Sequence, residues 1–500
     1  MDLDNIGRVN QFYSEQSGLD SPSAIRRVVI QKRATLKAIR HKIAQLVKRE
    51  KEIEEELVRF SIALAPHNHN VLPNELLSRV FILVAQVHGP VKFPIPKRNL
   101  PPQLAISHVC SHWRKVALRT AELWGNTRLS YPQKYHPGHV VLLHQRWLLR
   151  ATSVPVTLSI SFDGSELDDD EIPSALEKII LPLQVKKLRL NLTCKEFGAL
   201  STFPETALPG LTELELELTP PEDESEVMPN MTNPPHFITK LRSLKFGPGE
   251  RGTWFDQLSP SLPWAQLRSL GCHMCMIDLH PILDILRQLP TLQVLSLTVF
   301  EFNIVDIDLE GQLNMPSLRD IYLDVDGDVV NGKQLDRILR GFTCPSLTKF
   351  KLSTNAYWTC ETFQILKLQY NMQQIEELEF FCCNFAMPVS SILRDAPMLR
   401  SLSTRNAVMD DEAIFGISNG TLGWFLRESK VSAIGGVGEL LSMVEARKKR
   451  VDELIESGYS WSEGMTMLKD VVFYHGERKK EDEARIVALK EAGIIITYCC

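Results

Sequence analysis

A short apolar pattern recurs through the middle of this 500-residue chain and limits the folds open to it. Stretches such as LTELELEL, LRSLKFG, LQVLSLT and LRDIYLD place apolar side chains at the first, fourth and sixth positions. Successive copies begin 24 to 30 residues apart. The nine starting positions are Val185, Leu211, Leu241, Leu267, Leu292, Leu318, Leu347, Ile375 and Leu399. A repeat of this length predicts stacked copies of one supersecondary unit, because one copy alone cannot bury its apolar face.

The period and the L-x-x-L-x-L core are typical of leucine-rich repeats, in which each copy contributes a strand and a helix. The helical half is visible in HPILDILRQLP (His280 to Pro290), where a proline precedes the next strand. An earlier, degenerate strand is expected at VTLSIS, from Val156 to Ser161. We therefore predict an α/β solenoid, a leucine-rich-repeat horseshoe, with repeats over residues 183–410 and a linker and capping repeat over 131–182.

Residues 411–500 lose the regular pattern but keep signs of alternating helices and strands. The stretch ELLSMVEARKKRVDELIES predicts one long helix, and LKDVVFY predicts a strand. ARIVALKEAGIIITY predicts a helix that Gly493 ends before a last strand. We expect degenerate closing repeats that cover the apolar end of the solenoid.

In strands of this kind, the residue at the fifth position, between the last two apolar residues of L-x-x-L-x-L, is expected on the concave face. By analogy with leucine-rich-repeat proteins, that face would bind a partner protein, here called the target. One such residue comes from each repeat: Arg189, Glu215, Lys245, Gly271, Ser296, Tyr322, Lys351, Glu379 and Ser403. The signs of neighbouring residues alternate, so most of these charges are expected to pair across strands. His273, Tyr322 and Phe381 are the better candidates for target-binding anchors.

Residues 25–62 carry apolar side chains in alternating steps of three and four. They are Val29, Leu36, Ile39, Ile43, Leu46, Ile53, Leu57 and Phe60, with Lys32 and Glu50 as the polar interruptions. This stripe predicts a coiled-coil helix that follows a flexible N-terminus over residues 1–24. The region from Arg26 to Arg49 is basic and glutamates crowd the end, so self-association in antiparallel orientation would match opposite charges. A single solvated helix docked on the chain's own body is the alternative.

Residues 68–130 hold a second helical pattern. Pro73 and Glu75 favour a helix start. A backbone N–H at the first helical position would have no acceptor within the helix, so proline is tolerated there, and the helix N-terminus attracts negative charge. Leu76, Leu77, Val80 and Phe81 follow on one side of that helix. The stretch HGPVKFPIPKRNLPP holds five prolines and is expected to be non-helical. The helical period then returns at Ile106, Val109, Cys110, Trp113, Val116 and Ala117, and AELW closes the unit.

The order Leu72-Pro73-x-Glu75-Leu76-Leu77, Val80-Phe81, Val109-Cys110-x-x-Trp113 and Leu123-Trp124 resembles an F-box. The proline-rich insertion departs from the compact form but is similar to the version common in mushroom-forming (basidiomycete) fungi, whose F-box proteins often carry a leading coiled coil. The resemblance implies docking on the Skp adaptor of a cullin–RING (SCF-type) ubiquitin ligase. The adaptor-binding residues it implies are Leu72, Pro73, Leu76, Leu77, Val80, Phe81, Val109, Cys110, Trp113 and Trp124.

The resemblance implies a non-catalytic receptor that presents a protein target for ubiquitination. A leucine-rich-repeat scaffold without any link to ubiquitination is the alternative, separated from the first by adaptor binding. A formal net charge of −5 argues against a nucleic-acid partner. MDLDNIGRVN lacks an apolar signal core, no apolar run reaches membrane-spanning length, and the ten cysteines follow no framework spacing. We therefore expect a cytoplasmic or nuclear protein.

Three motifs resemble ligand sites, but no metal, cofactor or catalytic residue is expected. CHMC (Cys272 to Cys275) lacks a second pair of cysteines, and Cys275 falls at the turn of its repeat. GDVVNGKQ (Gly327 to Gln334) is close to a phosphate-binding loop, yet Gln334 replaces the required hydroxyl and Asp328 would repel phosphate. Nucleotide switching at Gly327 to Lys333 is therefore the weakest of the three functions considered. The histidines at 67 to 70 are too few for a metal site.

Overall fold

The computed structural model describes residues 22–64, 72–96, 100–130, 137–162, 171–180, 183–193, 208–219, 240–247, 264–274, 279–300, 313–326, 332–354, 357–358, 360–381, 384–385, 388–432, 436–457, 465–474 and 480–499. The chain divides into two compact units, Met1–Leu77 and Ser78–Cys500. The boundary falls within one helix, α3 (Asn74–His88).

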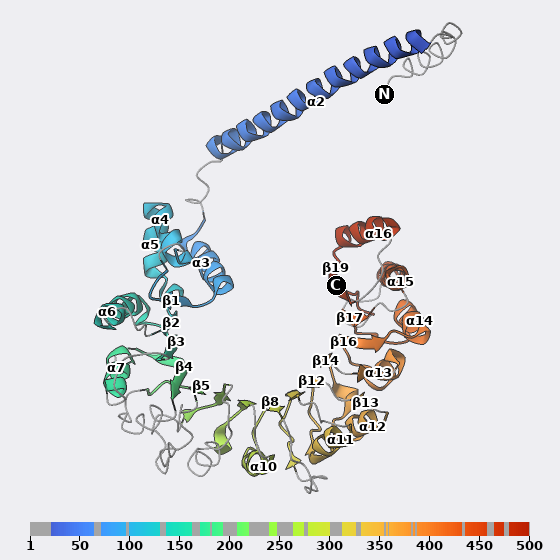
Figure 1. Ribbon diagram of the computed structural model, residues 1–500. Helices are drawn as coiled ribbons and strands as arrows, with labels where there is room; N and C mark the ends of the chain where they lie inside the picture. Colours follow the sequence, from blue (N-terminus) through green and yellow to red (C-terminus); the bar gives the residue numbers. More distant parts are fainter. Residues whose placement is uncertain are drawn as a thin grey trace. The chain divides into compact units, whose positions relative to one another are not determined.

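The first unit is dominated by a single long helix, α2 (Pro22–Leu64), of 43 residues (Figure 1). No proline or glycine follows Pro22 within it, and proline is well tolerated at the first helical position. The helix extends slightly beyond the predicted range of 25–62 at both ends. Nearly all side chains from Val28 to Glu56 are exposed, so its apolar stripe meets solvent in the isolated chain.

Short helices open the second unit: α4 (Pro102–Val109), α5 (Ser111–Arg119) and the 3-10 turn η3 (Ala121–Leu123) follow α3. Helix α3 begins one residue after Pro73, whose carbonyl oxygen accepts the Leu77 N–H at 3.0 Å. The predicted helical period around Trp113 is split into α4 and α5 at Cys110, whose backbone is extended. The Cys110 thiol accepts the Trp113 N–H at 3.4 Å and so caps α5.

Among the described residues, fifteen strands form one parallel sheet whose strands follow one another in chain order. They are β1 (Val91–Phe93), β2 (Asn126–Ser130), β3 (Val156–Ser161), β4 (Val185–Thr193), β5 (Glu213–Thr219), β6 (Ser243–Phe246), β7 (Ser269–Met274), β8 (Val294–Phe300), β10 (Asp320–Asp326), β12 (Lys349–Thr354), β14 (Glu377–Phe381), β16 (Ser401–Val408), β17 (Glu428–Ser432), β18 (Asp470–Tyr474) and β19 (Ile495–Cys499). The nine strands predicted from the repeat, and VTLSIS before them, are all confirmed.

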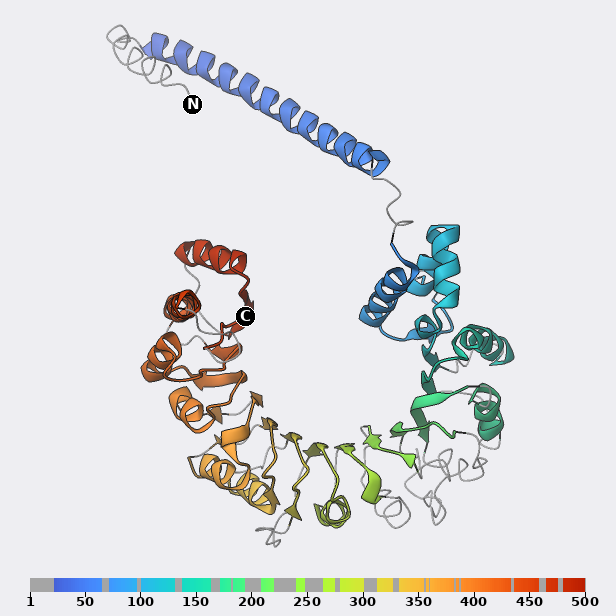
Figure 2. The ribbon, with the colours of Figure 1, turned by 180° about the vertical axis from the view of Figure 1, so that it is seen from behind.

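Within the second unit, the strands line the inner side of an arc and the helices lie along its outer side (Figures 1 and 2). The helices are α6 (Pro137–Leu148), α7 (Glu171–Ile180), α10 (Leu279–Arg287), α11 (Gly332–Gly341), α12 (Cys360–Gln369), α13 (Val389–Asp395), α14 (Asp411–Asn419), α15 (Val437–Glu456) and α16 (Lys480–Glu491). Two short parallel pairs, β9 (Leu313–Asn314) with β11 (Phe342–Thr343) and β13 (Tyr357–Trp358) with β15 (Asn384–Phe385), lie outside the main sheet.

The core lies between the sheet and the helices and is built from the repeated leucines. Leu188, Leu214, Leu244, Leu270 and Leu295 are direct neighbours in the register and are all buried. Parallel strands covered by helices on one face place every second side chain in that core. The chain is therefore an α/β leucine-rich-repeat solenoid, as predicted.

The sheet is longer than the sequence indicated at its start. Strand β1 lies inside the proline-rich stretch that was expected only to be non-helical, and it pairs with β2 through Val91 and Thr127. At the other end, the predicted long helix, strand, helix and last strand are confirmed as α15, β18, α16 and β19, with a positive φ at Gly493. Helix α14 and strand β17 were not predicted.

Candidate functional site

Helix α3 carries apolar side chains on two faces. Leu77 and Phe81, four residues apart, are each 1% exposed. A second set follows the same helical spacing but meets solvent. This exposed α3 face consists of Leu76 (55% exposed), Val80 (46%), Leu83 (50%) and Val87 (85%). A helix that is apolar on both sides exceeds what its own fold needs, and exposed apolar patches of this kind mark interaction sites.

The ten adaptor-binding residues implied by the F-box resemblance fall into three groups. The exposed ones are Leu72, Pro73, Leu76, Val80 and Val109. Those of intermediate exposure are Cys110 and Trp113, and those buried are Leu77, Phe81 and Trp124. Phe81 packs on Trp113 with ring centroids 5.0 Å apart. Leu83 and Val87 were missed, although their spacing from Val80 is helical.

Trp124 joins these helices to the first repeat. Its Nε1 donates to the Ala117 carbonyl oxygen at 2.9 Å, and its ring packs edge-on against Trp147 of α6 at 4.8 Å. The Arg150 guanidinium lies 4.5 Å from the centroid of the Trp124 ring and 5.8 Å from that of Trp147. The helices from α3 to η3 are called the helical head below. Such cation–π packing and aromatic contacts join the helical head and the solenoid in one core.

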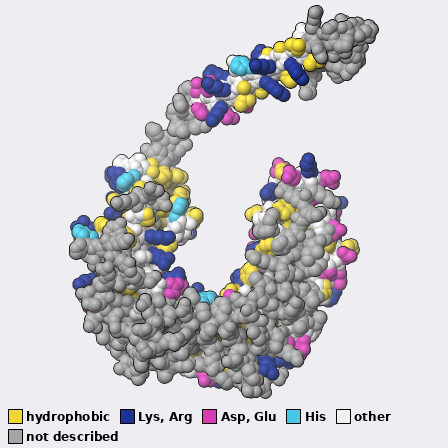
Figure 3. All heavy atoms as spheres, in the orientation of Figure 1, with side chains coloured by type: hydrophobic (Ala, Val, Ile, Leu, Met, Phe, Trp, Pro, Cys, Tyr) yellow, Lys and Arg dark blue, Asp and Glu magenta, His cyan; other side chains and the backbone are white. Residues whose placement is uncertain are grey.

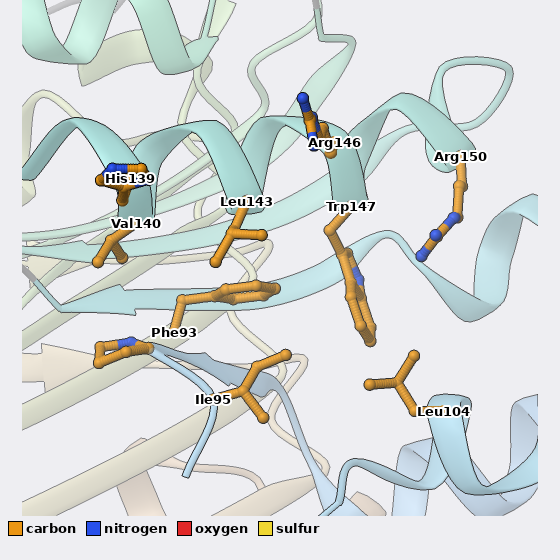
Figure 4. A pocket seen from close by; sticks show the side chains of 10 residues that line it. Phe93, Ile95, Leu104, His139, Val140, Leu143, Arg146, Trp147 and Arg150 are labelled. Atoms are coloured by element: carbon orange, nitrogen blue, oxygen red, sulfur yellow. The ribbon is translucent and has the colours of Figure 1, made fainter. Parts of the chain in front are cut away.

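A cavity of about 620 Å³ lies beside this cluster. Its lining is Phe93, Pro94, Ile95, Leu104, His139, Val140, Leu143, Arg146, Trp147 and Arg150. Figure 4 shows Val140, Leu143 and Trp147 directed from α6 toward Phe93 and Ile95, with Arg150 at one end. None of these lining residues is acidic. The cavity has the size and apolar walls of a small-molecule site, and its arginines suit an anionic group.

His144 packs against Phe93, one of the residues that line this cavity. Its ring packs edge-on against Phe93 at 5.0 Å, and its Nε2 is 2.9 Å from the Thr127 hydroxyl. Burial lowers the pKa of His144 to about 4, because the charged form would lose its hydration. His144 is therefore neutral at physiological pH and is part of the packed core.

The register of the sheet aligns the predicted concave residues in one continuous row. Arg189, Glu215, Lys245, Gly271 and Ser296 are direct partners on β4 to β8. Tyr322, Lys351, Glu379 and Ser403 continue the row on β10 to β16. Ser403 is buried, in contrast to its predicted place on an open face; Leu402 and Thr404 beside it are buried too. Gly271 within the row is buried as well, and Lys430, the partner of Ser403 on β17, is half-exposed, so the burial of one small residue does not end the row.

The charges of this surface pair largely with one another, as predicted. Lys351 lies 2.6 Å from Glu379, and the adjacent Lys349 lies 2.6 Å from Glu377. Arg189 lies 3.5 Å from Glu215 and also contacts Glu217. The Lys245 side chain lies over Gly271, where an added Cβ would be 3.0 Å from Lys245 Cγ. These pairs are half-buried and still meet solvent, where ion pairs contribute little to stability, so they determine the charge pattern of the surface more than the stability of the fold.

His273 and Tyr322 belong to one polar cluster on β7, β8 and β10. His273 Nδ1 lies 2.9 Å from the Thr298 hydroxyl, and the Tyr322 hydroxyl donates to Asp324 at 3.3 Å. Partial burial, followed by the charge of Lys245, lowers the pKa of His273. Phe381 lies on β14, with β12 between it and Tyr322, so the register does not bring it into this cluster.

The structure describes only part of the motifs that resemble ligand sites. The Cys272 thiol is fully buried and its pKa is raised by burial, while Cys275 lies outside the described residues. Residues 327–331 of the loop-like motif and the histidines at 67 and 69 are also outside them. Among the described residues, no group of three His, Cys, Asp or Glu side chains is placed to hold a metal ion. No helix in that part of the chain is long and apolar enough to cross a membrane.

Similarity to known proteins is remote. No protein-family description and no curated protein matches the chain. A solved complex of TLR13 with ssRNA13 is similar over 63% of this chain and 45% of its own, at 12% identity and a TM-score of 0.35. The plant peptide hormone receptor RGFR1 in complex with RGF2 is similar over 63% and 49%, at 11% identity and a TM-score of 0.28. The chain spans about half the length of these structures.

Proposed function

We propose that this protein is the substrate-recognition subunit of an SCF-type ubiquitin ligase. Its helical head, from α3 to η3, would dock on the Skp adaptor and through it on a cullin. Its solenoid would hold an unidentified target protein. The protein would then act by bringing the target near the transferred ubiquitin and would need no catalytic residue of its own.

The exposed α3 face is the observation that carries this proposal. Helix-in-groove recognition uses apolar anchors at positions i, i+3, i+4 and i+7, and Leu76, Val80 and Leu83 follow that spacing. Hydrophobic side chains gather over the helices that open the second unit in Figure 3. The buried set, Leu77 and Phe81, supports the helix from the other side. The docking surface therefore narrows to the exposed residues of the motif, with Leu83 and Val87 added.

The solenoid supports the second half of the proposal. Its inner face presents a long row of polar side chains on rigid strands, and extended concave surfaces of this type bind other proteins. His273 and Tyr322 remain the proposed target contacts, with Phe381 as a separate one. A protein of this kind would work in the cytoplasm or nucleus.

Co-purification with a fungal Skp adaptor tests the adaptor half. We expect the full chain to capture the adaptor and a variant with Leu76→Asp and Val80→Asp to lose it, because two charges in an apolar interface cost roughly several kcal/mol. Both residues are exposed, so the variant should keep the circular dichroism spectrum and melting temperature of the wild type. Leu149→Asp, at an equally exposed leucine of η4 (Leu149–Ala151), is the matched control and should bind normally.

Failure of the folded wild type to bind any Skp adaptor would overturn the ligase proposal. The leucine-rich-repeat scaffold without ubiquitination would then be the better description, because the concave surface does not depend on the head. Equal loss of binding in Leu149→Asp would show that the effect is not specific to the α3 face.

A further inference from the structure

Helix α2 exposes an apolar stripe along its described length. The stripe consists of Val29, Leu36, Ile39, Ile43, Leu46 and Ile53, all of them exposed. Alternating steps of three and four residues keep these side chains on one line of the helix, which is the seam of a coiled coil. Water contact along such a seam is unfavourable, so the stripe needs an apolar partner of matching length.

Two charged residues interrupt the seam and restrict which partner can cover it. Lys32 occupies the layer between Val29 and Leu36, and Glu50 occupies the layer between Leu46 and Ile53. In a parallel pair of identical helices, each charged residue would face its own copy and repel it. An uncharged apolar partner would leave both charges buried without compensation.

We propose that α2 pairs with α2 of a second copy in antiparallel orientation, in the register that places Lys32 opposite Glu50 of the partner. The same register puts Val29 opposite Ile53, Leu36 opposite Leu46 and Ile39 opposite Ile43 of the partner. Every apolar layer then meets an apolar layer, and the two-fold axis lies near residue 41. Because the interface is isologous, the lysine–glutamate layer occurs twice, once at each end.

The neighbouring antiparallel register, shifted by one heptad, explains less. It would place Lys32 opposite Leu57 and Glu50 opposite Ile39, so both charges would face apolar side chains. One repulsion opposes the proposed register, because the positively charged Arg40 and Lys42 of the two copies meet near the two-fold axis. These residues flank the seam and are exposed, where solvent and salt screen repulsion, so the seam layers decide the arrangement.

Charge reversal in the full-length chain tests the orientation and the register together. Sedimentation equilibrium should show a dimer for the wild type. Lys32→Glu alone, or Glu50→Lys alone, creates two like-charge layers and should weaken dimerisation about 100-fold. The double variant restores both opposite-charge layers and should return to within about threefold of the wild type, since its layers are the same two charges exchanged.

A distance measurement supplies an independent check. A spin label at Glu55→p-acetylphenylalanine, an exposed position off the seam, spares the ten native cysteines. The proposed register separates the two labels by about 42 Å along the axis, the heptad-shifted register by about 32 Å, and a parallel pair by the width of two helices only. The measured distance between the labels therefore distinguishes the three arrangements.

A monomeric wild type at about 100 μM, single variants that dimerise as well as the wild type, or a label distance of either other arrangement would each overturn the proposal. The inference does not rest on adaptor docking, because α2 and the exposed α3 face are tested by different variants. Lys32→Glu should capture the adaptor normally if the ligase proposal holds, and Leu76→Asp with Val80→Asp should leave the dimer intact.

Discussion

The Nη1 atom of Arg447 on α15 donates a 3.0 Å hydrogen bond to the carbonyl oxygen of Ile417 near the end of α14. The Arg447 side chain is completely buried. Its other hydrogen-bond acceptors are the carbonyl oxygens of Gly423, Trp424, Leu426 and Thr466. Burial lowers the pKa of Arg447 to about 10, so the guanidinium stays charged near neutral pH. One side chain thus ties α14, the loop before β17 and the segment before β18 into the closing repeats.

Replacing Arg447 should therefore damage the C-terminal end of the solenoid. Arg447→Leu removes the guanidinium donors from all five carbonyl oxygens, of which only those of Gly423, Trp424 and Leu426 have a second donor among the described residues. We expect the loss of this buried hydrogen-bond network to cost about 3 to 5 kcal/mol. Urea unfolding followed by circular dichroism measures this loss. Arg450→Leu, three residues along the same helix and exposed with an ion pair to Glu453, is the control and should cost less than about 1 kcal/mol. Equal effects of the two substitutions would contradict the role given to Arg447.

His144 should make stability depend on pH in a defined window. Its pKa is about 4 in the folded chain and 6.5 when unperturbed, so the unfolded chain binds more protons between these values. Stability from this residue is present above pH 6.5 and is lost as the pH falls toward 4. Since a tenfold change in proton affinity is worth about 1.4 kcal/mol, the loss between pH 7 and 4.5 should be about 2 to 3 kcal/mol.

The measurement is the free energy of unfolding at pH 7 and pH 4.5 for the wild type and for His144→Gln. Carboxylates titrate in the same range, but they are common to both proteins, so the difference between the two pH dependences isolates the contribution of His144. The variant should show the smaller decrease. An identical decrease in both proteins would mean that His144 is not buried in its neutral form.

Gly416 offers a substitution whose sign depends on packing. It lies inside α14, where Gly→Ala normally stabilises a helix by up to about 1 kcal/mol. Here a Cβ would lie 2.7 Å from the Leu422 side chain, so we expect Gly416→Ala to destabilise the chain by about 1 to 3 kcal/mol. Thermal melts of Gly416→Ala, Leu422→Ala and the double variant form the test. The double variant should be less destabilised than the sum of the two, and strict additivity would count against the clash.

Gly416 also illustrates what the sequence can and cannot predict. The nine strands were predictable because the spacing of the leucines encodes both the repeat and the buried face of each strand. The row from Arg189 to Tyr322 followed from the same spacing, since parallel strands in register align equivalent positions. Such periodicity carries no information about which side chain approaches a given glycine from the next loop.

Contacts between different repeats could not be predicted from the sequence for the same reason. Arg447 stands in the basic run ARKKR, and nothing in that run distinguishes it from the exposed Arg450. The contact of Trp124 with Trp147 joins two segments that the pattern assigned to different domains. Strand β1 has only three residues among prolines, and its pairing with β2, not its own propensity, makes it a strand.

Neighbouring residues of α3 should separate stability from adaptor binding. Phe81 is buried against Trp113, so Phe81→Ala should destabilise the chain by about 3 to 5 kcal/mol through the cavity it leaves. Val80 belongs to the exposed α3 face, so Val80→Ala should change stability by less than about 0.5 kcal/mol.

Adaptor affinity should follow the opposite order once folding is taken into account. Titration calorimetry at a temperature where both variants remain folded should show weaker adaptor binding for Val80→Ala, by about tenfold, because its methyl groups would leave an apolar interface. Phe81→Ala, if folded, should bind within a few-fold of the wild type, since the ring does not reach the surface. Normal affinity in Val80→Ala, together with a large loss in folded Phe81→Ala, would place the docking surface on the other side of the helix.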